Sequence, residues 1–177
     1  IEEIIDKMME LDLQYIVLGT GEPRYEEMLE RIKKKYPKKV GIHIGFSEEL
    51  AHLIEAGADI FLMPSRYEPC GLNQMYSLRY GTVPVVRKTG GLADTVEEFN
   101  PKTGRGTGFL FEKYNGQELL KALKKALNFY KNKKVWLKLM KNGMAKDFSW
   151  SVSARKYVEL YEKLVSVQKK ARTVKVK

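Results

Sequence analysis

The chain has 177 residues, of which 44% are hydrophobic and 31% charged, with a formal net charge of +10. This size suits one large domain or two small ones, and the composition excludes a disordered chain. We expect no membrane helix, because no apolar stretch is long enough, and no secretory leader, because the sequence does not open with a basic and then apolar segment. The single cysteine favours a reducing, cytoplasmic location. Since residue 1 is Ile rather than Met, we expect a longer parent chain.

The positive charge is concentrated in the last third of the sequence. Residues 121–177 hold 17 Lys and Arg against 3 Asp and Glu, whereas residues 1–120 hold 15 against 19. A basic region can bind nucleic acid or an anionic membrane. Here the aromatic residues are not interleaved with the basic ones as base stacking requires. We interpret the region as Lys-rich solvent-exposed helix faces and expect neither nucleic acid nor membrane as a partner.

Segments with helical and strand periodicity alternate along the chain. The predicted order is helix 1–11, strand 12–19, helix 23–36, strand 40–46, helix 48–56, strand 58–63, a helix from about 71 to 80, strand 82–87, a short helix within 88–99, strand 109–111, and helices 115–131, 134–146 and 152–168. Pro23 and Ser47 suit helix starts, and Gly57 and Gly81 suit residues just beyond helix ends. The alternation predicts an α/β fold, a three-layer α/β/α Rossmann-like doubly wound parallel sheet followed by carboxyl-terminal helices.

Three polar or glycine-rich segments follow consecutive predicted strands, namely GFSEE at 45–49, SRYEPCGLN at 65–73 and KTGGL at 88–92. Ligands of such sheets bind at the carboxyl ends of the strands. The helix start near Gly71 suits a phosphate, and glycine permits its close approach. Glu68 would repel a phosphate but would accept hydrogen bonds from hydroxyl groups. The pattern predicts a sugar nucleotide, unless Glu68 only caps the helix.

Other motifs argue against several common chemistries. GTGEPR at 19–24 lacks the third glycine of a dinucleotide fingerprint, and no P-loop motif is present. His43 and His52 lack the spacing of a metal site. Cys70 has no evident histidine partner that would make it a nucleophile.

Residues 65–96, SRYEPCGLNQMYSLRYGTVPVVRKTGGLADTV, resemble the carboxyl-terminal domain of bacterial glycogen synthases and plant starch synthases. The similarity extends through 41–64 and 106–112 and ends with FSW at 148–150. These enzymes are retaining glucosyltransferases with a GT-B fold, which has two Rossmann-like halves. The resemblance implies a nucleotide-sugar-binding domain over 1–150, and a crossing helix with a basic tail over 151–177.

The resemblance also implies a site. Glu68 would be the catalytic group that contacts the donor glucose, and Phe46 would flank the base. The implied substrate-binding residues are Gly45, Phe46, Cys70, Gly71, Leu72, Asn73, Thr89, Gly90 and Gly91. The implied donor is ADP-glucose, with UDP-glucose possible because ring stacking tolerates either base. Glucose would be added to the non-reducing end of an α-1,4-glucan with retention, without a cofactor or a bound metal.

Two parts of the family's fold would lie outside this sequence, namely the amino-terminal domain and the first strand of the present domain. That strand belongs at the centre of the sheet. The five remaining strands could close up in the order 2-1-3-4-5, leave an open gap, or accept a strand from another chain. Helix 152–168 has an apolar stripe, so we expect it to dock on the missing domain unless it packs in its own core.

Two alternatives to a synthase remain open at this point. The first is another GT-B nucleotide-sugar transferase, of the sucrose- or trehalose-forming type. Such relatives usually have a Glu at the position of Tyr76. The second is a non-catalytic module that binds a nucleotide or a glucan.

Overall fold

The structure is a computed structural model that describes residues 1–174. It divides into two units, Ile1–Ala145 and Lys146–Lys177, which are described separately. The last three residues of the predicted basic tail, 175–177, lie outside the described residues. The predicted domain boundary after residue 150 stays a prediction.

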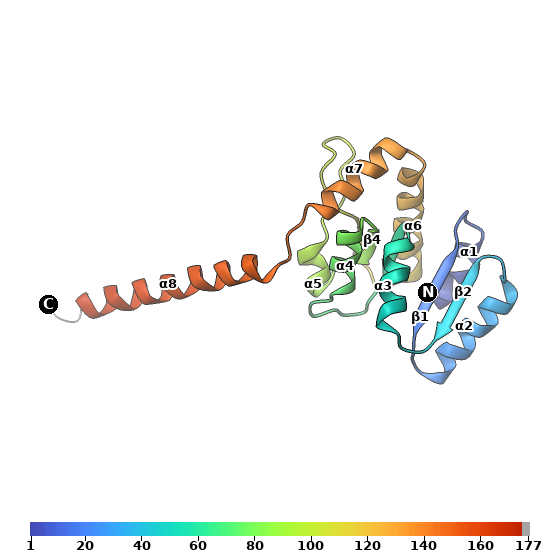
Figure 1. Cartoon of the computed structure of the whole chain (residues 1–177), viewed down its shortest axis with the longest axis horizontal. Helices are drawn as coiled ribbons and strands as arrows, with labels where there is room; N and C mark the ends of the chain where they lie inside the picture. Colours follow the sequence, from blue (N-terminus) through green and yellow to red (C-terminus); the bar gives the residue numbers. More distant parts are fainter. Residues whose placement is uncertain (175–177) are drawn as a thin grey trace. The chain divides into compact units, whose positions relative to one another are not determined.

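The first unit alternates helices and strands in the predicted order (Figure 1). Its strands are β1 (Tyr15–Gly19), β2 (Val40–Ile44), β3 (Ile60–Met63), β4 (Val83–Arg87) and β5 (Phe109–Phe111). Its helices are η1 (Glu2–Ile4), α1 (Ile5–Met9), α2 (Pro23–Lys35), α3 (Glu48–Gly57), α4 (Asn73–Tyr80), α5 (Gly90–Thr95), α6 (Gly116–Tyr130) and α7 (Lys133–Met144).

Helix ends follow local sequence signals. Pro23 occupies the first turn of α2, and the Ser47 hydroxyl accepts a hydrogen bond of 3.2 Å from Leu50 N–H at the start of α3. Gly81 ends α4 with φ of 88°, a left-handed conformation that glycine adopts without steric cost. These three predictions are confirmed. Gly57 is the last residue of α3 rather than the residue beyond it.

The strands form two parallel sheets rather than one. β1 pairs with β2, and β4 lies between β3 and β5. The predicted parallel α/β architecture is confirmed. The closed order 2-1-3-4-5 is wrong, because no strand pairing among the described residues joins β1 to β3. The open gap is the alternative that the structure contains.

A cavity of about 470 Å³ occupies this gap. Residues 14–18 and 58–62, which include most of β1 and β3, line two of its walls, and residues of α3 and α6 contribute to the rest. The strands cannot simply move together, since Tyr15 of β1 and Ile60 and Leu62 of β3 already pack against cores that include helical residues. Closing the gap would require those helices to shift with the strands.

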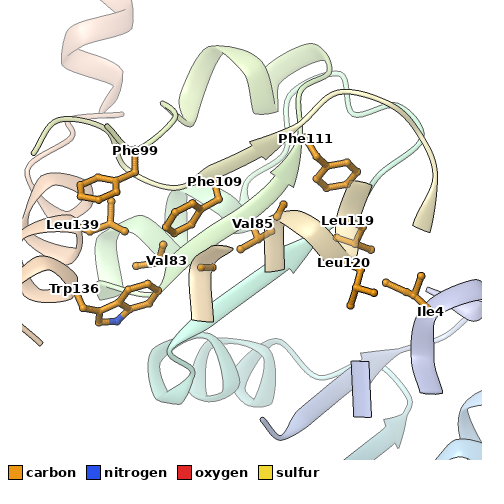
Figure 2. Packing of buried hydrophobic residues seen from close by; sticks show 12 residues of the cluster. Ile4, Val83, Val85, Phe99, Phe109, Phe111, Leu119, Leu120, Trp136 and Leu139 are labelled. Carbon is orange, nitrogen blue, oxygen red and sulfur yellow. The ribbon is translucent and has the colours of Figure 1, made fainter. Parts of the chain in front are cut away.

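The larger core cluster lies between the β4-β5 pair and helices α6 and α7 (Figure 2). Val83 and Val85 share one face of β4, whereas Val86 packs on another cluster with Leu92 and Val96. The alternation follows from the two-residue period of a strand. β4 is therefore buried on both faces, which fixes the position of its carboxyl end. The labelled core residues are Ile4, Val83, Val85, Phe99, Phe109, Phe111, Leu119, Leu120, Trp136 and Leu139.

A second cluster packs helices α1, α2 and α6 with β2. Its buried members are Ile5, Met8, Met9, Ile32, Val40 and Leu123. Helix α6 contributes Leu119 and Leu120 to the first cluster and Leu123 to the second. This helix thereby connects the two sheets on either side of the gap.

The second unit contains one described helix, α8 (Trp150–Val174). Its predicted apolar stripe is present, and each of these side chains is at least half exposed: Tyr157, Val158, Tyr161, Leu164 and Val165. Docking of this stripe on another domain stays a prediction. No helix of the described residues is long and apolar enough to cross a membrane.

Glu55 of α3 lines the cavity, and among the described residues its buried Oε2 has no hydrogen-bond partner. Burial raises the pKa of this carboxyl above its ordinary value of 4.5, against a smaller lowering effect of His52. When the pKa of an acid is higher in the folded than in the unfolded state, its contribution to the free energy of unfolding is fully present below the unfolded pKa. That contribution is lost as the pH rises through the folded pKa.

We therefore expect Glu55→Gln to raise the Tm of the chain more at pH 8 than at pH 4. Thermal denaturation at both pH values measures this effect. Glu49→Gln, which removes an exposed carboxylate from the same helix, is the matched control. An equal Tm change at both pH values for Glu55→Gln would contradict the expectation.

Candidate functional site

The candidate site lies where β3 and β4 end, in loop 64–72 and the segment that begins α5. Glu68 is half-buried, and the Ser65 hydroxyl donates a hydrogen bond of 3.4 Å to its Oε2. Among the described residues no side-chain cap hydrogen bond forms at the start of α4, so the structure gives no support to the alternative that Glu68 caps this helix. The carboxylate lies in the middle of loop 64–72, next to the Ser65 hydroxyl.

The loop enters α4 through a glycine turn. Gly71 has φ of 75°, a left-handed conformation, and α4 begins two residues later at Asn73. Cys70, Leu72 and Asn73 are exposed around this turn. The first N–H groups of a helix have no intrahelical acceptor and carry partial positive charge. The turn thus offers a place for an anionic group a few residues from Glu68.

The start of α5 supports this loop through the backbone. Gly91 N–H donates a hydrogen bond of 3.0 Å to the Glu68 carbonyl. A Cβ at Gly90 would lie 2.0 Å from Glu68 O, and a Cβ at Gly91 would lie 2.1 Å from Cys70 O. Both positions therefore require glycine for contact between the two segments. The structure brings Thr89, Gly90 and Gly91 beside the loop, and their contribution to ligand binding stays a prediction.

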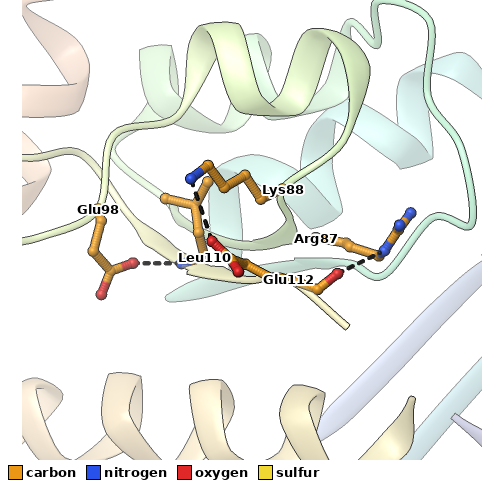
Figure 3. Close-up of polar contacts among 5 residues, drawn as sticks. All are labelled: Arg87, Lys88, Glu98, Leu110 and Glu112. Carbon is orange, nitrogen blue, oxygen red and sulfur yellow. Dashed lines mark hydrogen bonds and ion pairs between the residues drawn. The ribbon is translucent and has the colours of Figure 1, made fainter. Parts of the chain in front are cut away.

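Arg87, the last residue of β4, is a supporting residue that the sequence analysis missed. Its guanidinium donates to the carbonyl oxygens of Ser65 at 3.4 Å and of Arg66. It also donates to Glu112 O at 3.2 Å, while Lys88 forms an exposed ion pair of 3.4 Å with the Glu112 carboxylate (Figure 3). Arg87 therefore fixes the first residues of loop 64–72 to the segment after β5. A charged residue at the end of a buried strand was the available signal.

Gly45 and Phe46 lie in a different place, after β2 in the other sheet. Gly45 N–H donates a hydrogen bond of 3.1 Å to Gly19 O at the end of β1. The Phe46 side chain is 91% exposed, which suits stacking on a planar ligand. No hydrogen bond that the structure describes joins this pair to loop 64–72. A ligand would have to connect them to Glu68.

Two further observations concern the chemistry. The Tyr76 ring, eight positions after Glu68, lies with its centroid 5.1 Å from that of His52 in α3. Among the described residues, no three His, Cys, Asp or Glu side chains form a group that could hold a metal ion. The residues present offer hydrogen-bonding, stacking and backbone N–H contacts.

Comparison with known proteins identifies relatives of the chain. Residues 3–142 match the family model described as glycosyl transferases group 1. The glycogen synthase of Koribacter versatilis is 52% identical over 168 residues, which is 95% of this chain and 35% of that protein. The glycogen synthase of Thermotoga petrophila is 55% identical over 165 residues, covering 93% and 34%. The chain thus spans about a third of the length of the curated relatives it matches.

Solved structures show the same relationship. The catalytic domain of starch synthase IV from Arabidopsis thaliana, bound to ADP and acarbose, has a TM-score of 0.81 and 37% identity. The match covers 93% of this chain and 35% of that one. A sucrose-phosphate synthase from Thermosynechococcus elongatus has a TM-score of 0.64 and 23% identity, over 94% and 42% of the two chains. At that identity the likeness shows a shared fold alone.

Proposed function

Because the chain belongs to the glycosyl transferases group 1 family, we propose that it is the donor-binding part of a glycogen or starch synthase. The proposed reaction transfers glucose from ADP-glucose to the non-reducing end of an α-1,4-glucan with retention, and it uses no cofactor or bound metal. Identities of 52 to 55% with glycogen synthases support the assignment. The structural observation that carries it is the hydrogen bond from Gly91 N–H to Glu68 O. This bond joins loop 64–72, which contains the Glu68 carboxylate, to the glycine-rich start of α5.

The proposed contacts divide the donor among three segments. Glu68 accepts hydrogen bonds from the glucose hydroxyls, and residues 70–73 hold the phosphates and ribose. Phe46 stacks on the base, which would carry the ligand from one sheet to the other. Thr89, Gly90 and Gly91 complete the wall of the donor site. These roles follow the family resemblance together with the positions described above.

The alternative of a sucrose- or trehalose-forming transferase is less well supported. Its members usually have a Glu where this chain has Tyr76, and that tyrosine packs on His52. The similarity to a sucrose-phosphate synthase reaches only 23% identity, compared with 37% for the starch synthase.

The test is a transfer assay with the full-length protein that contains this chain. Labelled glucose from ADP-glucose should enter glycogen, and a parallel assay with UDP-glucose ranks the two donors. Exclusive transfer from UDP-glucose would correct the donor, and no transfer from either would contradict the proposed function.

We expect the 177-residue chain by itself to bind ADP weakly, with a Kd of about 10⁻⁴ to 10⁻³ M, or about −4 to −5.5 kcal/mol. A helix terminus contributes only about 0.3 to 2 kcal/mol toward an anion. The rest must come from contacts with the base and ribose. Titration calorimetry measures the Kd.

Phe46→Ala should weaken this binding further, whereas Tyr25→Ala in α2 serves as a control for the loss of an aromatic ring. Sub-micromolar ADP binding by the chain would show that the phosphate site lies elsewhere.

A further inference from the structure

Gln74, in the first turn of α4, is fully buried and joins two segments of the candidate site. Its Nε2 lies 3.0 Å from the carbonyl oxygens of both Cys70 and Gly71. The same nitrogen lies 3.2 Å from Oγ1 of Thr95, the last residue of α5. One side-chain amide thus connects the glycine turn of loop 64–72 with the helix that begins at Gly90.

The hydrogen-bond directions in this connection are determined by Thr95. Its hydroxyl donates to Gly91 O at 2.6 Å, so Oγ1 has only lone pairs left for Gln74. The carbonyls of Cys70 and Gly71 are also acceptors, and all three contacts need a donor. Within the Gln74 side chain only the amide nitrogen donates, and its two hydrogens are shared among the three acceptors. Among the described residues the buried Oε1 has no hydrogen-bond partner, so the contacts with Nε2 decide the orientation of the amide.

The loop is consequently tied to α5 on both sides of Pro69. Before it, Gly91 N–H donates to Glu68 O at 3.0 Å. After it, Gln74 holds the carbonyls of Cys70 and Gly71 and reaches Thr95. Networks of buried hydrogen bonds restrict their members to one arrangement. The hydrogen bonds on the two sides of Pro69 therefore fix the position of Glu68 relative to the start of α4.

We infer that Gln74 is a positioning residue for the donor: it holds the Cys70–Gly71 turn against α5 so that the Glu68 carboxylate and the α4 N-terminus face one ligand. The inference rests on the proposed function. Gln74 acts through the loop, because its side chain is fully buried and does not reach a ligand itself. A substitution distant from the reacting atoms that misplaces the substrate by about 1 Å can lower the rate about 10²-fold.

The test uses Gln74→Leu in the full-length protein, because Leu has a similar volume and no donor. The kcat/KM for ADP-glucose should fall roughly 10- to 100-fold, while the KM for the glucan acceptor stays unchanged. Thr95→Val, which removes the hydroxyl at the other end of the tie, should change the donor kinetics in the same direction. The fold loss in donor kcat/KM of the double variant should be smaller than the product of the two single fold losses, since the residues share one connection.

Ser77→Ala is the matched control. Ser77 lies on the same helix and is equally buried, and its hydroxyl has no hydrogen-bond partner among the described residues. This variant should retain wild-type donor kinetics. A fall in the donor kcat/KM of Ser77→Ala equal to that of Gln74→Leu would overturn the positioning role and indicate a general packing effect.

A second measurement does not depend on activity. Cys70 is exposed in the turn that Gln74 holds, so its alkylation rate, mapped by peptide mass spectrometry, reports on the order of the loop. The rate should rise in Gln74→Leu and stay unchanged in Ser77→Ala. If Gln74→Leu lowers only the Tm, with donor kinetics and alkylation as in the wild type, the inference is overturned. If the wild type transfers no glucose, the proposed function fails, and the alkylation comparison still decides whether Gln74 positions the loop.

Discussion

Glu68→Gln in the full-length protein should lower kcat by about 10² to 10³ with little change in ADP affinity. The glycosidic bond of a sugar donor breaks with positive charge developing on the ring, which a fixed carboxylate stabilises. Gln retains the size of Glu and an acceptor for the Ser65 hydroxyl, but it lacks the negative charge. ADP contains no glucose, so its binding does not involve this contact. Steady-state kinetics and an ADP titration separate the two quantities.

Glu118→Gln is a suitable control for this experiment, because Glu118 is also a half-buried carboxylate but lies in the first turn of α6. Its kcat should remain near the wild-type value. Near-normal kcat in Glu68→Gln would contradict a catalytic role. Joint loss of ADP binding and thermal stability would assign Glu68 a structural role instead.

The 177-residue chain alone should transfer no glucose to a glucan above the blank without protein. Glycosyl transfer needs donor and acceptor held together in a site that excludes water. The chain matches only about a third of the length of its glycogen synthase relatives, so most of the proposed enzyme would be missing from this assay. The measurement is incorporation of labelled glucose into glycogen. An ADP titration and a circular dichroism spectrum of the same sample establish that the chain is folded, and measurable chain extension would refute the expectation.

Local signals in the sequence predicted the elements of the fold well. Ser47 and Gly81 act within one helical turn of their own position, so their effect does not depend on distant residues. The start of strand β1 was predicted less well, because the strand begins at Tyr15 and not at residue 12. The carbonyl oxygen of Leu11 accepts a hydrogen bond of 2.8 Å from the Lys39 side chain, and Leu13 packs on the second core cluster. The residues just before Tyr15 are thus held by contacts other than the β1-β2 ladder.

The candidate site was predicted only in part. Sequence motifs marked Glu68 and the glycines of the α5 segment, but a glycine can face either a ligand or another part of the chain. The Cβ distances show that Gly90 and Gly91 are needed where two backbone segments meet. Gln74 lies inside the family-like stretch 65–96, but nothing in that pattern marked it for the proposed positioning role, because its contact with Thr95 spans 21 positions. Contacts between distant segments cannot be read from local spacing.

The gap between β1 and β3 has a consequence for the behaviour of the chain in solution. Natural sheets usually protect a free edge with charged residues, proline, a bulge or a covering loop. Strands YIVLG at 15–19 and IFLM at 60–63 contain neither a charge nor a proline, and Ile16 is 51% exposed. Along the gap, the facing edges of β1 and β3 have no partner strand among the described residues, so their peptide N–H and C=O groups are not used in a sheet there. We therefore expect the isolated chain to be prone to strand addition between copies at high concentration.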